Sequence, residues 1–261
     1  MRTLKIRNNA NEINFTATVH EDFYVNADKT FAKGTVRHYS GKMPNGEYRP
    51  SIFLPVAILA PKGEKLAIDA DLLKKDARVI IKGYVIGTHE DFTTKTGNRV
   101  VRDGIQIVVG KDGIFKANEE VTVGTKTVLA NENSIRINGC MVSDLTISES
   151  GKYAYGRIAR NCGKDKDGND RPAAFIDINI FPAEEGKKVE VNAADFKKGT
   201  FVLVDGYLRN REYEKDGSKK TTLAIVVNGH GAFKANPLTE VTIDDEGNVV
   251  KNDDDLPAET I

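Results

Sequence analysis

The chain has 261 residues, 39% hydrophobic and 29% charged, which is an ordinary globular balance and enough for about two domains. No apolar run approaches the roughly 20 residues that cross a bilayer, and the start lacks the apolar core of a signal peptide, so we expect a cytoplasmic protein without a membrane partner. Residues 242–261 hold seven acids and one base, so this −6 segment leaves +6 on the rest of a chain of zero net charge, a balance that favours a polyanion-binding body.

The sequence repeats itself. Residues 113–118 (Gly-Ile-Phe-Lys-Ala-Asn) return as 231–236 (Gly-Ala-Phe-Lys-Ala-Asn), and each copy is followed by Glu-Val-Thr at 120–122 and 240–242. Residues 83–85 (Gly-Tyr-Val) return as 206–208 (Gly-Tyr-Leu), and Arg-Pro at 49–50 returns at 171–172. The offset drifts between 122, 123 and 118, as loop insertions and deletions would cause. We therefore predict a duplicated unit of roughly 110 residues.

In the first copy, residues 31–39 are expected as a second strand, with a third strand following near Phe53. Asp69 is expected to cap a short helix that contains residues 72–75. A charged hairpin around residues 89–99 follows the fourth strand.

The second copy shows the strands more clearly. Residues 134–142, 153–158, 174–181, 201–208 and 221–227 read as five strands, the third alternating strictly between apolar and polar residues. Asn192 is expected to cap a short helix over residues 193–198, with Gly199 ending it. We expect Phe115, Phe181, Phe196, Phe201 and Phe233 in the core.

Five strands with one helix between the third and fourth is the plan of the OB-fold barrel. The sequence therefore predicts an all-β protein of two tandem five-stranded OB-fold barrels, at 10–122 and 132–242, followed by a disordered acidic tail at 243–261.

Cations and flat rings fall on segments that should border one groove in each barrel. Cationic side chains can contact the phosphates of a strand, and aromatic rings can stack on its bases. This combination therefore predicts binding of single-stranded nucleic acid. The nucleic-acid-binding candidates are Phe31, Lys33, Arg37, Tyr39, Tyr48, Arg49, Phe53, His89, Phe92 and Lys95 in the first copy, and Tyr153, Tyr155, Arg157, Arg171, Phe175, Arg209, Arg211, Tyr213, Lys215 and Lys219 in the second.

No pattern of catalytic or metal-binding residues emerges. Cys140 and Cys162 are expected as reduced thiols, and the four histidines lack metal-ligand spacing. The acids around Gly168 lack the glutamate that a calcium loop carries at its twelfth position, where Ile176 stands. We expect no metal, no cofactor and no enzymatic activity.

Residues 171–181 and 197–213 resemble the third and fourth strands of the bacterial single-stranded DNA-binding protein family. The resemblance implies that Phe175, Tyr213 and Phe181 stack on bases and that Arg209 and Arg211 contact phosphate. It also implies a homodimer that coats single-stranded DNA during replication, recombination, repair or DNA transfer. Replication or recombination proteins would dock on a tail tip formed by Asp253, Asp254, Asp255, Leu256 and Pro257.

Several features depart from that family. The tip continues past Pro257 without the usual phenylalanine, and Glu90 and Leu59 stand in the first copy where Tyr213 and Phe181 stand in the second. The first copy is therefore expected to bind less tightly or to serve in assembly. Two alternatives stay open, an RNA-binding OB-fold protein and a protein-interaction module of a phage or conjugative element.

Overall fold

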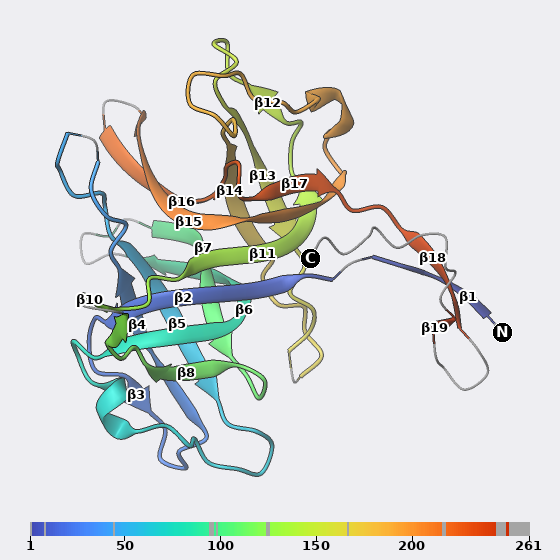
Figure 1. The fold of residues 1–261 in the computed structure, drawn as a ribbon. Helices are drawn as coiled ribbons and strands as arrows, with labels where there is room; N and C mark the ends of the chain where they lie inside the picture. The colour runs from blue at the N-terminus through green and yellow to red at the C-terminus, as the bar shows by residue number, and fades with distance from the viewer. Residues whose placement is uncertain are drawn as a thin grey trace.

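The computed structural model describes residues 2–7, 9–43, 45–93, 97, 99–123, 126–165, 167–215, 218–243 and 249–250. Within these ranges the regular structure is β-strand apart from two short 3-10 turns (Figure 1). None of the described residues belongs to a helix with the length and hydropathy needed to span a membrane.

The first barrel closes through five strands. The strand order is β2-β4-β5-β7-β6 and back to β2, and only the β5–β7 pair is parallel. This circuit is that of an OB-fold. Its strands are β2 (Asn11–Val19), β4 (Phe31–His38), β5 (Ile52–Leu59), β6 (Arg78–Thr93) and β7 (Arg99–Val109), with β3 (Tyr24–Val25) beside β4 and β8 (Ile114–Ala117) beside β6.

The second barrel repeats the same circuit, β11-β13-β14-β16-β15 and back to β11, with β14–β16 as its parallel pair. The predicted tandem OB-fold is confirmed by these pairings. The strands are β11 (Asn133–Met141), β13 (Ala154–Arg160), β14 (Ala174–Ile180), β15 (Phe201–Lys215) and β16 (Ser218–Val227), with β12 (Thr146–Ile147) beside β13 and β17 (Ala232–Ala235) beside β15.

Alternation along the strands fills the barrel interiors. In β14, Ile176 and Ile178 are fully buried in the core cluster, whereas Phe175 and Asp177 between them are half-buried on the outer face. Burying each such isoleucine contributes about 1.5–3 kcal/mol, so the apolar residues decide which face of each strand points inward.

The two barrels share one continuous sheet, because β2 pairs antiparallel with β11. Ile13 and Ile135, which occupy equivalent positions in the two copies, pair with each other at the centre of this seam. The Asn11 amide exchanges hydrogen bonds with the backbone of Val85 (3.0 and 2.9 Å), and the equivalent Asn133 does the same with Leu208 (2.9 and 2.8 Å). The seam therefore has pseudo-two-fold symmetry.

Two small sheets lie outside the barrels. Between the copies, β9 (Val121–Val123) pairs with β10 (Lys126–Val128). At the other end, β1 (Arg2–Ile6) pairs with β18 (Thr239–Ile243), which also pairs with β19 (Val249–Val250). This small sheet brings the two ends of the described chain together to one side of the barrels (Figure 1).

The predicted helices are shorter than expected. They occur as single 3-10 turns, η1 (Ala70–Leu73) and η2 (Ala193–Asp195), each capped at the predicted residue: Asp69 accepts from the Asp71 amide and Asn192 from the Ala194 amide. The second turn stops because Phe196 leaves helical geometry (φ −120°, ψ 64°) and packs in the core against Phe233, with ring centroids 4.5 Å apart.

Two of the five core phenylalanines were wrongly predicted. Phe115 and Phe196 are buried and Phe233 is half-buried, but Phe181 and Phe201 are 39% and 37% exposed. Phe181 directly follows Ile180, so the strand alternation turns it to the outer face. The Phe201 ring lies under the Arg7 guanidinium, 3.8 Å from its centroid.

Candidate nucleic-acid interface

The outer face of the second barrel is formed by β13, β14, β16 and β15. The register places Tyr155, Asn179, Val226 and Tyr207 in one row across these strands. The next row contains Arg157, Asp177, Ala224 and Arg209, and the row beyond it contains Phe175, Thr222 and Arg211. We call these residues, with Tyr153 and Phe181, the repeat-2 face.

Three aromatic rings cluster at one end of this face. The Tyr153 ring centroid lies 5.9 Å from that of Tyr155 and 6.1 Å from that of Phe181. Tyr155 and Phe181 are 40% and 39% exposed, so their ring surfaces are open to a ligand. Rings of this kind are the platforms on which successive bases stack.

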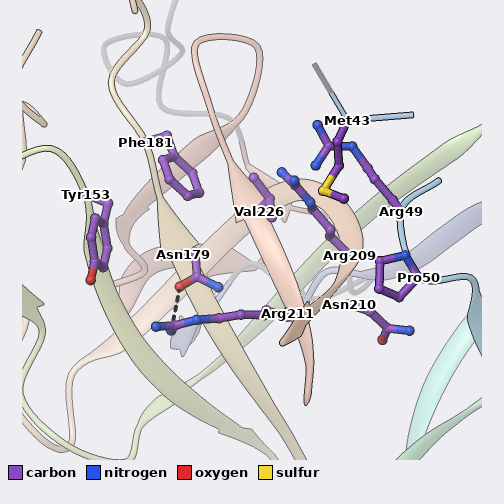
Figure 2. Close-up of a pocket in the computed structure, with 11 residues that line it drawn as sticks. Met43, Arg49, Pro50, Tyr153, Asn179, Phe181, Arg209, Asn210, Arg211 and Val226 are labelled. Carbon is purple, nitrogen blue, oxygen red and sulfur yellow. Dashed lines mark hydrogen bonds between the residues drawn. The ribbon is translucent and has the colours of Figure 1, made fainter. Parts of the chain in front are cut away.

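A pocket of about 420 Å³ lies beside the rings, between the two barrels (Figure 2). The second barrel supplies its floor, and the loop between β4 and β5 of the first barrel forms the opposite wall. We call it the cross-barrel pocket; it is lined by Met43, Arg49, Pro50, Tyr153, Asn179, Phe181, Arg209, Asn210, Arg211, Ala224 and Val226.

The cross-barrel pocket is cationic. Among the described residues that line it, Arg49, Arg209 and Arg211 are charged and none is acidic. Figure 2 shows the Arg49 and Arg209 side chains extending in a similar direction, with Tyr153 and Phe181 at the other end of the pocket. Arginine suits phosphate because its planar guanidinium presents several donors at once.

Hydrogen bonds fix the polar groups of the pocket. Arg211 Nη1 donates to Asn179 Oδ1 at 3.4 Å (Figure 2). Asn210 Nδ2 donates to the Ser51 carbonyl oxygen at 2.6 Å, which ties the first-barrel loop to β15. These two bonds therefore set the positions of the Asn179 and Asn210 side chains within the pocket.

Two neighbouring hollows extend the pocket into a track. One shares Arg49 and Arg209 with it and adds Tyr39 and Tyr207. The other shares Tyr153 and Phe181 and adds Lys152 and Lys187. Burial raises the pKa of the Tyr207 hydroxyl, and the nearby Arg49 charge opposes that rise, so this arginine acts across the barrel boundary.

A second groove between the barrels is lined mainly by acidic rather than basic charged residues. It is lined by both Phe53 and Phe175, together with the acids Glu90, Asp103 and Asp177. Arg157 is its one basic residue among those described; this guanidinium lies 5.4 Å from the Phe175 ring centroid and 3.6 Å from the Asp177 carboxylate. We call it the acidic groove, because its charges disfavour a phosphate backbone.

The structure brings five residues of the predicted set around the track: Tyr39, Arg49, Tyr153, Arg209 and Arg211. Tyr155 and Arg157 are exposed on the repeat-2 face, and Arg171 is half-buried at the base of the loop between β13 and β14. Tyr48 is 72% exposed near Lys42, whose Nζ lies 4.9 Å from the ring centroid. Their role in binding stays a prediction.

The remaining candidates lie elsewhere. Phe31, Lys33 and Arg37 lie on the outer face of the first barrel, where the Lys33 ammonium lies over Tyr24 (5.7 Å) and the Arg37 guanidinium over Tyr39 (4.6 Å). His89 pairs with Asp103 at 2.9 Å. The strands that contain Phe92, Tyr213, Lys215 and Lys219 are described but the side chains are not, and Lys95 and the tip at 253–257 (Asp253, Asp254, Asp255, Leu256 and Pro257) lie outside the described residues.

Sequence reasoning missed Met43, Asn179, Asn210 and Tyr207, and it placed Phe181 in the core before the family resemblance suggested a stacking role. Asn210 lies between the two predicted arginines, which was an available signal. Nothing in the sequence indicates that a loop 159 residues away from it completes the pocket.

A metal-dependent site has no support in the residues described. Within those ranges, no three His, Cys, Asp or Glu residues gather in a way that could hold an ion. Cys140 and Cys162 are free thiols, and the Cys162 Sγ accepts a hydrogen bond from the Gly87 amide at 3.2 Å.

Comparisons with known proteins agree with this geometry. Residues 132–233 match the model of the Single-strand binding protein family. A single-stranded DNA-binding protein from Fusobacterium nucleatum subsp. nucleatum is 33% identical over 100 residues, which cover 36% of this chain. The match spans 62% of that relative's length, less than two thirds of it.

Solved structures show weaker likeness. Wild-type single-stranded DNA binding protein from Thermus aquaticus aligns with 87% of this chain and 91% of its own, at 14% identity and a TM-score of 0.46. A Plasmodium falciparum SSB in complex with ssDNA aligns with 41% of this chain and 96% of its own, at 19% identity and a TM-score of 0.32. The fold assignment above rests on the strand pairings of this chain alone.

Proposed function

We propose that this chain, whose residues 132–233 belong to the single-strand binding protein family, binds single-stranded DNA with little sequence preference and catalyses no reaction. The observation that carries the proposal is the cross-barrel pocket, where three arginines from two barrels meet two aromatic rings. Low sequence preference is expected because cation contacts to phosphate and stacking on rings do not read the edges of the bases.

The mechanism is passive. Arg49, Arg209 and Arg211 displace condensed counterions from the phosphates, and each such contact on a single strand makes the fall of log K with log salt steeper by about 0.7. Tyr153, Tyr155 and Phe181 stack on bases, which substitutes for base–base contacts and keeps the strand from re-pairing.

The wider role follows from this activity. The protein would coat and protect single-stranded DNA during replication, recombination, repair or DNA transfer. It would do so as a homodimer of two chains, each with OB-fold domains at 10–122 and 132–242. The acidic segment at 243–261 would recruit replication or recombination proteins. The cytoplasmic location stays a prediction from the sequence.

The proposal is tested by titrating fluorescein-labelled oligo-dT of several lengths at two salt concentrations. Because the chain contains no tryptophan, quenching of tyrosine fluorescence provides an independent signal. We expect saturable binding that weakens with salt and varies little between homopolymers. Failure to bind oligo-dT of any length would refute the proposal. A clear preference for oligo-U at equal salt would indicate that the ligand is RNA rather than DNA.

A further inference from the structure

The pseudo-two-fold seam allows each residue of the repeat-2 face to be compared with its counterpart in the first barrel. Equivalent positions in β4, β5, β7 and β6 follow from the matching registers of the two barrels. Thr35, Ile86 and Thr88 occupy the positions of Arg157, Arg209 and Arg211, and Ala57 and Leu59 occupy those of Asn179 and Phe181. The first barrel thus lacks the arginine pair at the centre of the track and one of the rings at its end.

The two loops that overhang these faces make equivalent backbone hydrogen bonds among their described residues. In the loop at residues 41–51, the Arg49 amide donates to the Gly41 carbonyl at 2.9 Å; in the loop at 163–173, Arg171 donates to Gly163 at 2.8 Å. Each loop crosses the seam to reach the opposite barrel. Differences between the two clefts therefore come from side chains rather than from loop shape.

The two clefts differ at one pair of equivalent residues, Asn210 on β15 and Gly87 on β6. On β15, the Asn210 side-chain amide reaches the Ser51 carbonyl of the first-barrel loop at 2.6 Å, which holds the loop one side chain away from the strand. The equivalent residue on β6 is Gly87, where an added Cβ would lie 2.3 Å from the Ala173 carbonyl oxygen. The second-barrel loop therefore lies directly on the β6 backbone at Gly87. We call the space under this loop the closed cleft and the space under the first-barrel loop, beside Asn210, the open cleft.

The loops also differ in what they offer to a strand. The loop over the open cleft carries Met43, Tyr48 and Arg49, whereas the equivalent positions in the loop over the closed cleft are Asp165, Asp170 and Arg171. Two aspartates thus replace a thioether and an exposed ring. The acidic groove belongs to both barrels, since Phe53, Glu90 and Asp103 line it from the first and Arg157, Phe175 and Asp177 from the second.

We propose that the two barrels bind single-stranded DNA asymmetrically: each chain holds one strand segment, in the cross-barrel pocket under the loop of the first barrel and over the neighbouring rings, and the outer face of the first barrel does not hold a second. The first barrel supplies Arg49 and the roof of the pocket, and Asn210 acts as a positioning residue that keeps the pocket open. This inference rests on the proposed function.

The test begins with stoichiometry. A short oligo-dT of about eight nucleotides fits the roughly 4–16 that one OB barrel covers, so it reports on single faces. Isothermal titration calorimetry of the full chain should give one strand per chain. Two strands per chain would overturn the inference while leaving the proposed function intact, whereas no binding to the full chain would remove both.

Matched charge variants locate the site. Arg209→Gln with Arg211→Gln removes two phosphate contacts, which should lower the salt slope by about 1.4 and affinity at 0.1 M salt by about 25-fold. Lys29→Gln with Lys33→Gln removes two exposed cations from the first barrel away from the track and should lower affinity by less than about threefold, from general charge alone. Equal losses in both double variants would overturn the inference, and thermal melts followed by circular dichroism verify that both remain folded.

A third variant isolates the positioning role. Asn210→Gly leaves every arginine in place but removes the spacer beneath the loop. Affinity for the short strand should fall, and the Asn210→Gln variant, which keeps an amide at this position, should recover part of the loss. Wild-type affinity in Asn210→Gly would contradict the role assigned to Asn210.

Discussion

Replacing Phe181 by alanine tests the aromatic end of the track most directly. Its ring is 39% exposed, lies 6.1 Å from that of Tyr153, and borders both the cross-barrel pocket and the hollow beyond it. Loss of one stacked base costs about 1–3 kcal/mol. We therefore expect Phe181→Ala to weaken oligo-dT binding by about 5- to 150-fold, since 1.4 kcal/mol corresponds to a factor of ten.

A double-mutant cycle with Tyr153→Ala refines this prediction. Residues closer than about 7–10 Å commonly fail to act additively, and the two rings are within that range. Bases that cover one ring should also touch its neighbour, so we expect the double variant to lose less than the sum of the two single losses.

The assay is fluorescence anisotropy with labelled oligo-dT at fixed salt. Tyr24→Ala serves as the matched control, because Tyr24 is 57% exposed on β3 of the first barrel and is absent from the track. This control should bind as the wild type does. If Phe181→Ala also binds within twofold of the wild type while remaining folded, the stacking assignment is refuted.

Three further predictions concern stability and the tail. Burial lowers the pKa of His38, and its hydrogen bond to the Thr16 backbone has a smaller opposing effect. In the unfolded chain the pKa is about 6.5, so His38 contributes to folding stability above that pH. This contribution declines as the pH falls below that value, because the unfolded state then binds the proton first. The melting temperature of the wild type should drop from pH 7.5 to 5, and that of His38→Gln should drop less. Parallel plots of melting temperature against pH for the two proteins would contradict this role of His38. Asn133→Ala should cost about 2–4 kcal/mol in urea unfolding by leaving the buried Leu208 backbone unpaired, and a loss below about 0.5 kcal/mol would contradict it. Residues 251–261 contain four acids and one base, so this segment would compete with DNA phosphates for the arginines. Deleting it should therefore raise DNA affinity at low salt only, because salt screens this competition. Unchanged affinity at low salt would contradict it.

The sequence predicts the barrels well, because alternation is a local property. Burial of Ile176 and Ile178 requires only that the strand keep its period of two, and the repeat supplies each strand twice. The same rule places Phe181 outside once the strand is known to continue through Ile180. The error at Phe181 arose from assigning a ring to the core by its apolarity rather than by its position in the alternation.

The contacts between the barrels could not be predicted from the alternation of apolar and polar residues. Alternation does not indicate which strand edge pairs with which, and the seam of β2 with β11 joins residues about 120 positions apart. The Asn210 bond to Ser51 depends on this seam, on a loop conformation and on one side-chain length. The pocket is a consequence of tertiary geometry, so the sequence showed its arginines but not the space between them.

Tandem duplication is what permits the two clefts to differ. In a symmetric dimer of single barrels, a glycine at the position of Gly87 would close both clefts and an asparagine would hold both open. In one chain the positions are separate residues, so Gly87 closes one cleft while Asn210 opens the other. The closed cleft then gives direct backbone contact between the barrels, which fixes the geometry of the open one. The seam of β2 with β11 and the Asn210 bond to Ser51 then place the loop of the first barrel beside the arginines of the second within one chain.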